Sequence, residues 1–326
     1  MKQINVVIAL RGFAALSVAL FHIVNAPLGF VEDETVRSIF VRGASGVQVF
    51  FIISGLVIPL SLIKSNFQFK LLGRFMLKRT IRIEPTYLAM IALSMAFIAF
   101  REVVLNDGGL AFPSLLTLFY NVTYMVPFVG GEWINAVFWT LGVELQYYLL
   151  IALIWPLAKS LDARTVLLLP VLGVLGNEII DGAFVLHWLH FFNVGIILAL
   201  FRCNKLSTRL FWLAQFATII GIYWNFSLFY ATLASLTLAV VFLFPDRSGG
   251  SFLQFLGKQS YSLYLIHGLV GCSAINILMR FVEFSAPWEY FVAVLLALGL
   301  SIVAAQLMFW CIERPTMRWS KGIDLQ

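Results

Sequence analysis

Two ionisable residues, Arg11 and His22, interrupt the otherwise apolar stretch ALRGFAALSVALFH near the start of the chain. An α-helix turns about 100° and rises about 1.5 Å per residue, so eleven residues bring the two side chains within about 20° of one face, roughly 16 Å apart. Histidine accepts and releases protons near neutral pH. This shared stripe makes His22 a candidate general base, with Arg11 a candidate for orienting or tuning the same site.

Two further ionisable residues, Glu144 and His267, stand in apolar segments far along the sequence. An ionisable group inside a bilayer costs at least about 2.5 kcal/mol, so each must face a partner, water or a cavity. Arg11 and Glu144 are interpreted either as a structural ion pair between two helices or as parts of a functional site. For His22 the plainer alternative is a histidine that reaches the membrane interface.

Secondary candidates accompany these residues. His267 and Tyr264 are three residues apart in GKQSYSLYLIH and share a helix face, either as an internal hydrogen bond or as part of a site. Ser54, in GVQVFFIISG, is a further candidate. Between Arg11 and His22, small side chains are expected to leave room for a narrow chain: Ala14, Ala15 and Val18.

A basic cluster, Lys78, Arg79 and Arg82, stands in FMLKRTIRIEPTY, just before Pro85, which is expected to open the next helix. Arg79 and Arg82 are three residues apart, so in a helix they point the same way and form a two-fork clamp for phosphate or pyrophosphate. The alternative is an ordinary basic anchor at the cytoplasmic membrane surface.

The composition places these residues in a membrane protein. Of 326 residues, 61% are hydrophobic and 12% charged, with a mean hydropathy of +0.94. Apolar runs of membrane-spanning length recur along the chain, which predicts one all-α, polytopic domain over residues 1–326. The loop at 102–135, with its NDGG and VGGE turns, is expected to lie against the bundle. About ten transmembrane helices are predicted: 4–25, 44–63, 85–101, 136–157, 165–180, 184–201, 207–223, 227–244, 260–280 and 288–311.

The charges between these segments predict an orientation. With both termini cytoplasmic, the inner face receives 17 of the 22 lysines and arginines and the outer face four. Topology and anionic lipid then account for the net charge of +6, and no nucleic-acid partner is expected. The three cysteines, Cys203, Cys272 and Cys311, form no close pair, so neither a disulfide framework nor a metal site is predicted.

Several of these fragments, in this order, resemble the acyltransferase-3 family of integral-membrane O-acyltransferases that modify exported glycans. Two positions depart from the usual family pattern, with Thr140 in place of serine and Tyr147 in place of phenylalanine. Nothing between about 160 and 255 contributes to the resemblance. The matching pieces are Arg11 and His22; GVQVFFIISG; Arg79, Arg82, Pro85 and Tyr87; WTLGVELQYYL with Trp139 and Glu144; GKQSYSLYLIH; and IERP with Glu313 and Pro315.

The resemblance implies transfer of an acyl group, most often acetyl, from cytoplasmic acyl-CoA to a sugar hydroxyl of an exported polysaccharide or a lipid-linked glycan precursor. It implies a multi-pass protein of the bacterial cytoplasmic (inner) membrane, with acyl-CoA as co-substrate and no cofactor. This chain resembles the standalone form, without the extracytoplasmic esterase-like domain of some relatives. We expect His22 to act as general base, Arg11 and Glu144 to tune the site, and the basic cluster to bind the donor.

One geometric difficulty follows. The hydrocarbon core is about 30 Å thick, while the basic cluster and His22 are predicted near opposite faces. Three arrangements would each bring the acyl group to His22: a first helix that sits lower in the membrane, a deep vestibule on the inner side, or a covalent relay.

Two other function classes stay open: a glycan-lipid transporter or flippase with Arg11 and Glu144 as substrate contacts, and a scaffold of an export complex.

Overall fold

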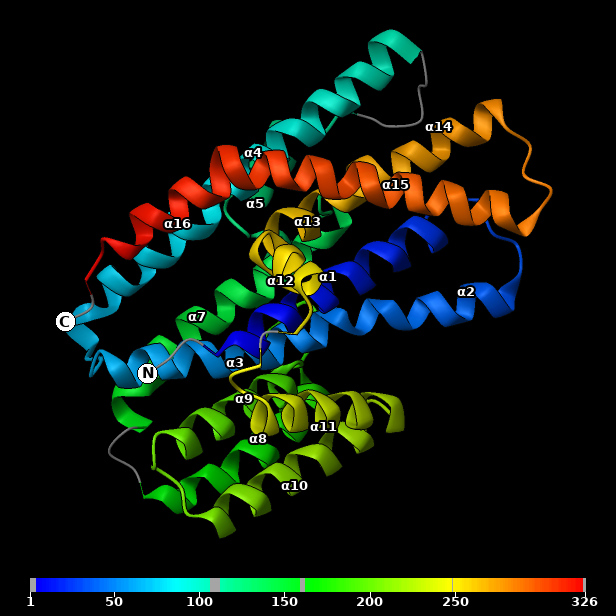
Figure 1. Ribbon diagram of the computed structural model, residues 1–326. Coiled ribbons are helices and arrows are strands. Elements are labelled where there is room, and N and C mark those ends of the chain that lie inside the picture. The colour runs from blue at the N-terminus through cyan, green and yellow to red at the C-terminus, as the bar shows by residue number, and fades with distance from the viewer. Residues whose placement is uncertain (1–3, 106–111, 159–161, 248, 325–326) are drawn as a thin grey trace.

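The computed structural model describes residues 4–105, 112–158, 162–247 and 249–324. Over these ranges the chain is helical and contains no strand (Figure 1). The predicted all-α class is therefore confirmed. The helices are α1 (Asn5–Asn25), α2 (Glu34–Val41), α3 (Gly46–Lys64), α4 (Leu72–Leu105), α5 (Leu115–Val122), α6 (Val126–Val129), α7 (Trp139–Ala158), α8 (Leu168–Ile179), α9 (Leu189–Arg202), α10 (Thr208–Asn225), α11 (Leu228–Leu243), α12 (Ser251–Lys258), α13 (Ser260–His267), α14 (Ser273–Phe281), α15 (Pro287–Met308) and α16 (Arg314–Lys321).

Short 3₁₀ and π-helical segments join some of these helices into longer rods. α2 continues into α3, α13 continues through a π-helical segment at Gly268–Cys272 into α14, and α15 continues through a second one at Phe309–Glu313 into α16. Six rods in the described chain are long and apolar enough to cross a membrane. They are Asn5–Asn25, Glu34–Lys64, Phe69–Glu102, Ala136–Leu157, Ser260–Phe281 and Pro287–Lys321.

The other four predicted spans also coincide with helices, but α8, α9 and α11 have only 12, 14 and 16 residues, and α10 has 18. A straight helix needs about 20 residues to cross the hydrocarbon core. The chain is thus a multi-pass helical protein, while the number of ten crossings and the cytoplasmic location of both termini stay predictions.

The expectation that Pro85 opens a helix is wrong. Pro85 lies inside α4, which begins thirteen residues earlier at Leu72 and carries the basic cluster on its own first turns. A proline inside a helix removes one backbone hydrogen bond, and neighbouring groups compensate for this in membrane helices. Near the proline, Tyr261 of α13 donates its hydroxyl to the carbonyl of Ile83 at 3.1 Å, which ties α4 to α13. This bond does not engage the carbonyl of Ile81, which Pro85 leaves without its helical donor.

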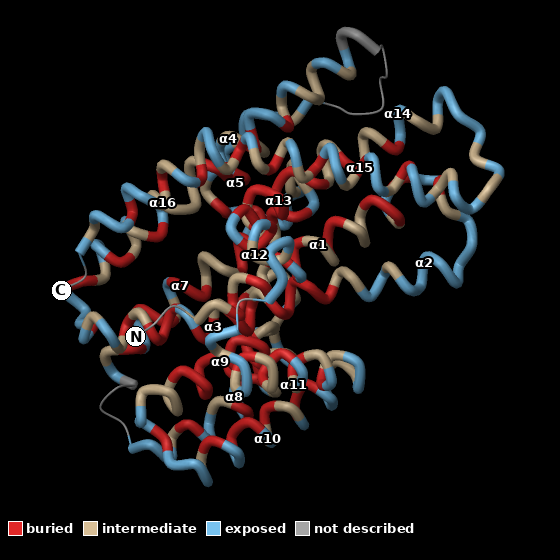
Figure 2. The backbone as a smooth tube through the Cα atoms, in the orientation of Figure 1, coloured by how far each residue is buried: buried red, intermediate tan, exposed pale blue. Residues whose placement is uncertain are grey.

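The most extensive helix contact in the described chain joins α3 to α9, and two glycines lie in it. A Cβ atom on Gly55 would collide with the carbonyl of Phe192, and one on Gly195 with the backbone of Ile52 and Leu56. Small residues let membrane helices approach until their backbones touch. Through this contact the group formed by α8 to α11 lies against the rest of the bundle (Figure 1), and buried residues concentrate where α1, α3, α9 and α13 meet (Figure 2).

The described part of the 102–135 loop lies against the bundle, as predicted. Tyr87 of α4 donates to the carbonyl of Asn121 at 2.8 Å, and its ring stacks on Tyr124 at 4.7 Å between centroids. The side-chain amide of Asn121 in turn donates to the backbone carbonyl of Glu132 at 3.0 Å. The VGGE turn is present, with Gly130 at a φ of 66°, whereas the NDGG turn at 106–109 lies outside the described residues.

The orientation makes a prediction that labelling can test. Lys70, exposed between α3 and α4, is expected on the cytoplasmic side because it belongs to the densest basic segment. In a chain whose three cysteines are replaced by alanine, a cysteine introduced by Lys70→Cys should react with a membrane-impermeant maleimide only after the cells are broken. Reaction in intact cells would contradict the orientation, and Arg37→Cys, in the predicted outer loop, provides the opposite control.

Candidate functional site

Three adjoining cavities lead into the bundle, and consecutive cavities share lining residues. The largest, here called the vestibule, has a volume of about 580 Å³, and the middle and deep cavities about 60 Å³ each. Arg11 lines all three. Arg82 and Glu313 line both the vestibule and the middle cavity, and Ser54 and Glu144 line both the middle and the deep cavity. The shared residues define one succession from the vestibule to the deep cavity.

Both chain termini lie at the same end of the bundle (Figure 1), and residues close to both termini line the vestibule. Its lining includes Ile4 at the start of the described chain, Lys64 at the end of α3 and Met317 of α16. On the predicted orientation this end faces the cytoplasm. Among the three alternatives for bringing an acyl group to His22, the cavity succession favours a deep inner vestibule.

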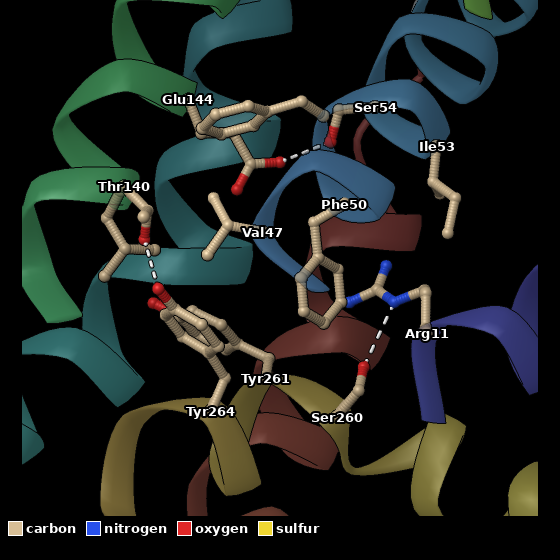
Figure 3. A pocket seen from close by; sticks show the side chains of 12 residues that line it. Arg11, Val47, Phe50, Ile53, Ser54, Thr140, Glu144, Ser260, Tyr261 and Tyr264 are labelled. Atoms are coloured by element: carbon tan, nitrogen blue, oxygen red, sulfur yellow. Dashed lines mark hydrogen bonds between the residues drawn. The ribbon is translucent and has the colours of Figure 1, made fainter. Parts of the chain in front are cut away.

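Arg11 points from α1 into this succession. Its Nε donates a hydrogen bond to the Ser260 hydroxyl at 3.1 Å, at the first residue of α13 (Figure 3). The guanidinium has further N–H donors, which face the cavities that Arg11 lines. The side chain is therefore anchored at one point and available to an anionic or carbonyl group at others.

Glu144 points from α7 toward the same space. Its Oε1 accepts a hydrogen bond from the Ser54 hydroxyl of α3 at 2.9 Å (Figure 3) and another from the Tyr148 hydroxyl one turn later. These two donors fix the carboxylate. Arg11, the partner expected from the sequence, donates to Ser260 instead. Arg11 and Glu144 share two cavities rather than forming a hydrogen-bonded pair. Ser54 is a direct partner of the candidate carboxylate.

The room expected beside the small residues of α1 is not present. Ala14 and Ala15 are fully buried, and α3 begins against them, since a Cβ atom on Gly46 would meet the carbonyl of Ala14 and the side chain of Val18. Small side chains on a membrane helix here mark close helix packing. The cavities lie on another side of α1, where Arg11 points.

Arg79 and Arg82 point in the same direction, as their spacing predicts, and both line the middle cavity. Arg79 is only 7% exposed and lies over the rings of Phe75 and Tyr148, at 5.3 and 5.5 Å from their centroids. Its Nε is buried and has no hydrogen-bond partner within the described protein. A buried guanidinium N–H without a partner is costly, so Arg79 is suited to a ligand that accepts its hydrogen bond.

Lys78 lies elsewhere. Its ammonium group donates to the carbonyl of Ile323 at 2.8 Å, just beyond α16, and Lys78 does not line the three cavities. One residue along a helix changes the direction of a side chain by about 100°, which carries Lys78 away from its neighbour Arg79. Within the predicted basic cluster, the two arginines belong to the site and the lysine ties α4 to the C-terminal segment.

His22 and His267 contact each other directly. The Nε2 atom of His267 and the Nδ1 atom of His22 are 3.0 Å apart, and the ring centroids are 4.9 Å apart. His22 is partly buried, whereas His267 is fully buried. The two histidines come from α1 and α13, 245 positions apart in the chain, and the sequence does not indicate this contact.

The backbone contacts of this pair assign its protons. The Nδ1 of His267 lies 3.1 Å from the carbonyl of Leu263, and the Nδ1 of His22 lies 3.0 Å from the carbonyl of Val18. A carbonyl only accepts, so in the neutral pair each Nδ1 carries the proton, and the single Nδ1–H of His22 is shared between the Val18 carbonyl and the Nε2 of His267. The Nε2 of His22 then keeps a free lone pair, which is the requirement for a general base.

Tyr264 lies between the deep cavity and the histidines. It lines the deep cavity, its ring centroid lies 6.0 Å from that of His267, and Phe50 packs edge-on against it at 5.7 Å. Its hydroxyl is 2.8 Å from that of Thr140 (Figure 3), so the hydrogen bond expected between Tyr264 and His267 is replaced by one to α7. His22 and His267 themselves do not line the three cavities.

Sequence reasoning missed several polar residues of this site. Ser260 and Ser262, at alternate positions in GKQSYSLYLIH, hold Arg11 and Glu313, respectively. Glu313 is 4% exposed, and its Oε2 accepts from the Ser262 hydroxyl at 2.6 Å and from the Ser262 amide at 3.1 Å. A buried carboxylate within an apolar helix is itself a signal of function, and Glu313 in IERP carried that signal.

Comparison with known proteins places the chain in a family. The model of the acyltransferase-3 family, described as an acyltransferase domain, matches residues 4–306. The chain therefore belongs to this family of membrane acyltransferases, and the resemblance based on its motifs is confirmed.

One curated relative resembles part of the chain. Nodulation protein 10 of Rhizobium leguminosarum bv. viciae is 31% identical over 180 residues, which cover 48% of this chain and 46% of that protein. The similarity thus spans less than half of the relative's length. No solved structure matches.

Proposed function

We propose that this acyltransferase moves an acyl group, acetyl in the simplest case, from cytoplasmic acyl-CoA to a sugar hydroxyl of an exported polysaccharide or a lipid-linked glycan precursor in a bacterial inner membrane. The observation that carries the proposal is the cavity succession. It leads from a basic vestibule past Arg82, Arg11 and Glu144 to Tyr264, which packs against the His267–His22 pair.

The donor would occupy this succession lengthwise. Its phosphates would bind Arg82 at the junction of the vestibule and the middle cavity, with Arg79 further along, through charge-assisted hydrogen bonds. Its thioester would reach the deep cavity, whose volume of about 60 Å³ suits a small acyl group. Arg11 would face the thioester oxygen, since it lines the deep cavity and keeps N–H donors beyond the one used by Ser260.

The acceptor would approach from the other side of Tyr264. The Nε2 of His22 would take the proton of the sugar hydroxyl as its oxygen attacks the thioester carbon, and the C–S bond would then break. The thiolate would recover a proton from the imidazolium, leaving an ester and free CoA. General-base assistance of this kind typically contributes about 10²- to 10⁴-fold in rate. Tyr264 and Phe50 line the deep cavity, and the two substrates would meet beside their rings.

One experiment separates this proposal from the other function classes. Purified protein in nanodiscs, incubated with acyl-labelled acyl-CoA and a panel of glycans, should release one CoA for each ester formed. Transport of a glycan-lipid without thioester consumption would instead support the flippase, and neither reaction would support the scaffold. Mass spectrometry of the product identifies the acyl group and the hydroxyl used.

A further inference from the structure

The mouth of the vestibule carries two lysines that the donor-binding arginines do not account for. Lys64 is the last residue of α3 and Lys258 the last residue of α12, 194 positions later, and both line the vestibule together with Arg82. Both are exposed. The fold thus brings two flexible cations from distant segments to the opening through which a donor would enter.

The charge of the vestibule is strongly one-sided. Four basic side chains line it against a single carboxylate: Arg11, Lys64, Arg82 and Lys258 against Glu313. That carboxylate already accepts two hydrogen bonds from Ser262. Among the described residues, no hydrogen bond or ion pair engages the ammonium group of Lys64 or Lys258. An opening lined by one sign of charge attracts a ligand of the opposite sign.

The remaining lining is apolar and large enough for a nucleotide. Val57, Leu60 and Phe309 contribute to it, and its volume of about 580 Å³ falls within the usual range of ligand pockets. Arg79 does not line this cavity and Lys78 is bound to Ile323, so neither can serve a group held at the mouth. A ligand that suits both the apolar lining and the two lysines at the mouth has an aromatic base and several negative charges.

We infer that Lys64 and Lys258 bind the phosphorylated adenosine end of acyl-CoA at the mouth of the vestibule, above all its ribose 3′-phosphate. This inference rests on the proposed use of acyl-CoA as donor. It divides recognition into two parts. The lysines select a donor that carries the nucleotide, while Arg82 and the deeper residues hold the arm that delivers the thioester.

Three donors that share one thioester test the inference: acetyl-CoA, acetyl-dephospho-CoA, which lacks the 3′-phosphate, and acetyl-pantetheine, which lacks the nucleotide. In the double variant Lys64→Gln with Lys258→Gln, the KM for acetyl-CoA should rise about tenfold with kcat retained, because two charge-assisted contacts are lost. The KM for acetyl-pantetheine should stay within about twofold of its original value. Lys205→Gln, an exposed lysine outside the vestibule, is the matched control.

The unmodified protein provides an independent measurement that does not depend on folding of the variant. It should prefer acetyl-CoA to acetyl-dephospho-CoA about tenfold at low salt, and the preference should shrink as ionic strength rises. An equal KM for the two donors, or an equal rise for all three donors in the variant, would overturn the inference and leave the acyltransferase proposal intact. Consumption of none of the three donors by the unmodified protein would instead contradict the proposed donor.

Discussion

His22→Ala is expected to lower the rate of glycan acylation by about 10²- to 10⁴-fold while acyl-CoA binding stays nearly unchanged. The Nε2 lone pair of His22 is lost, but the donor cavities keep every lining residue, because His22 lies beyond Tyr264 and outside them. Acylated product measured by mass spectrometry at matched protein levels gives the rate, and calorimetry on detergent-solubilised protein gives the donor affinity.

His187→Ala is the matched control for this variant. His187 is a partly buried histidine whose Nδ1 lies 2.9 Å from the carbonyl of Ile180, and it lies outside the three cavities. It should retain acylation. Substantial acylation by His22→Ala would show that His22 is not the base, and His267 with Tyr264 would be examined next.

Arg82→Lys should weaken acyl-CoA binding by about ten- to a hundredfold although the charge is retained. An ammonium group cannot reproduce the two-pronged geometry of a guanidinium on phosphate, and hydrogen bonds to charged groups contribute roughly 1.5–3 kcal/mol. Arg79→Lys should weaken binding as well, since Arg79 shares the middle cavity and has a buried Nε with no protein partner. Calorimetric titration with a non-hydrolysable acyl-CoA analogue measures both.

The exposed Arg209 at the start of α10 supplies the control substitution Arg209→Lys, which should leave the affinity unchanged. Unchanged affinity in both Arg82→Lys and Arg79→Lys would assign the two arginines to anchoring at the membrane surface. Because neither substitution removes a charge, a general loss of electrostatic attraction cannot produce the expected result.

The sequence singles out candidate residues for the site but not their contacts. Arg11, Glu144 and His22 stand out because an ionisable group in an apolar helix is costly and needs a reason. The helical spacing of Arg79 and Arg82 correctly predicts that their side chains point the same way, since both line the middle cavity. The energetic cost of burying an ionisable group identifies residues one at a time, and it does not indicate which helices lie side by side.

The errors have the same origin. Arg11 is held by Ser260, 249 positions away, and His22 by His267, 245 positions away, so neither partner follows from local periodicity. The prediction that Lys78 binds the donor with the rest of the basic cluster rested on its adjacency in sequence, yet in the folded chain its ammonium group donates to the carbonyl of Ile323. Pro85 carries a helix-start signal, yet it lies inside α4, because a proline within a long membrane helix is tolerated.

The aromatic pair of Phe50 and Tyr264 bears on the electrical integrity of the membrane. A bilayer that stores a proton gradient cannot contain an open aqueous path from one face to the other. The edge-on rings of Phe50 and Tyr264 line the deep cavity, the Tyr264 hydroxyl is held by Thr140, and the Tyr264 ring lies 6.0 Å from that of His267. Narrow apolar constrictions exclude water and ions. Closely packed rings at this position would limit the passage of water and ions from the cavities toward the histidine pair.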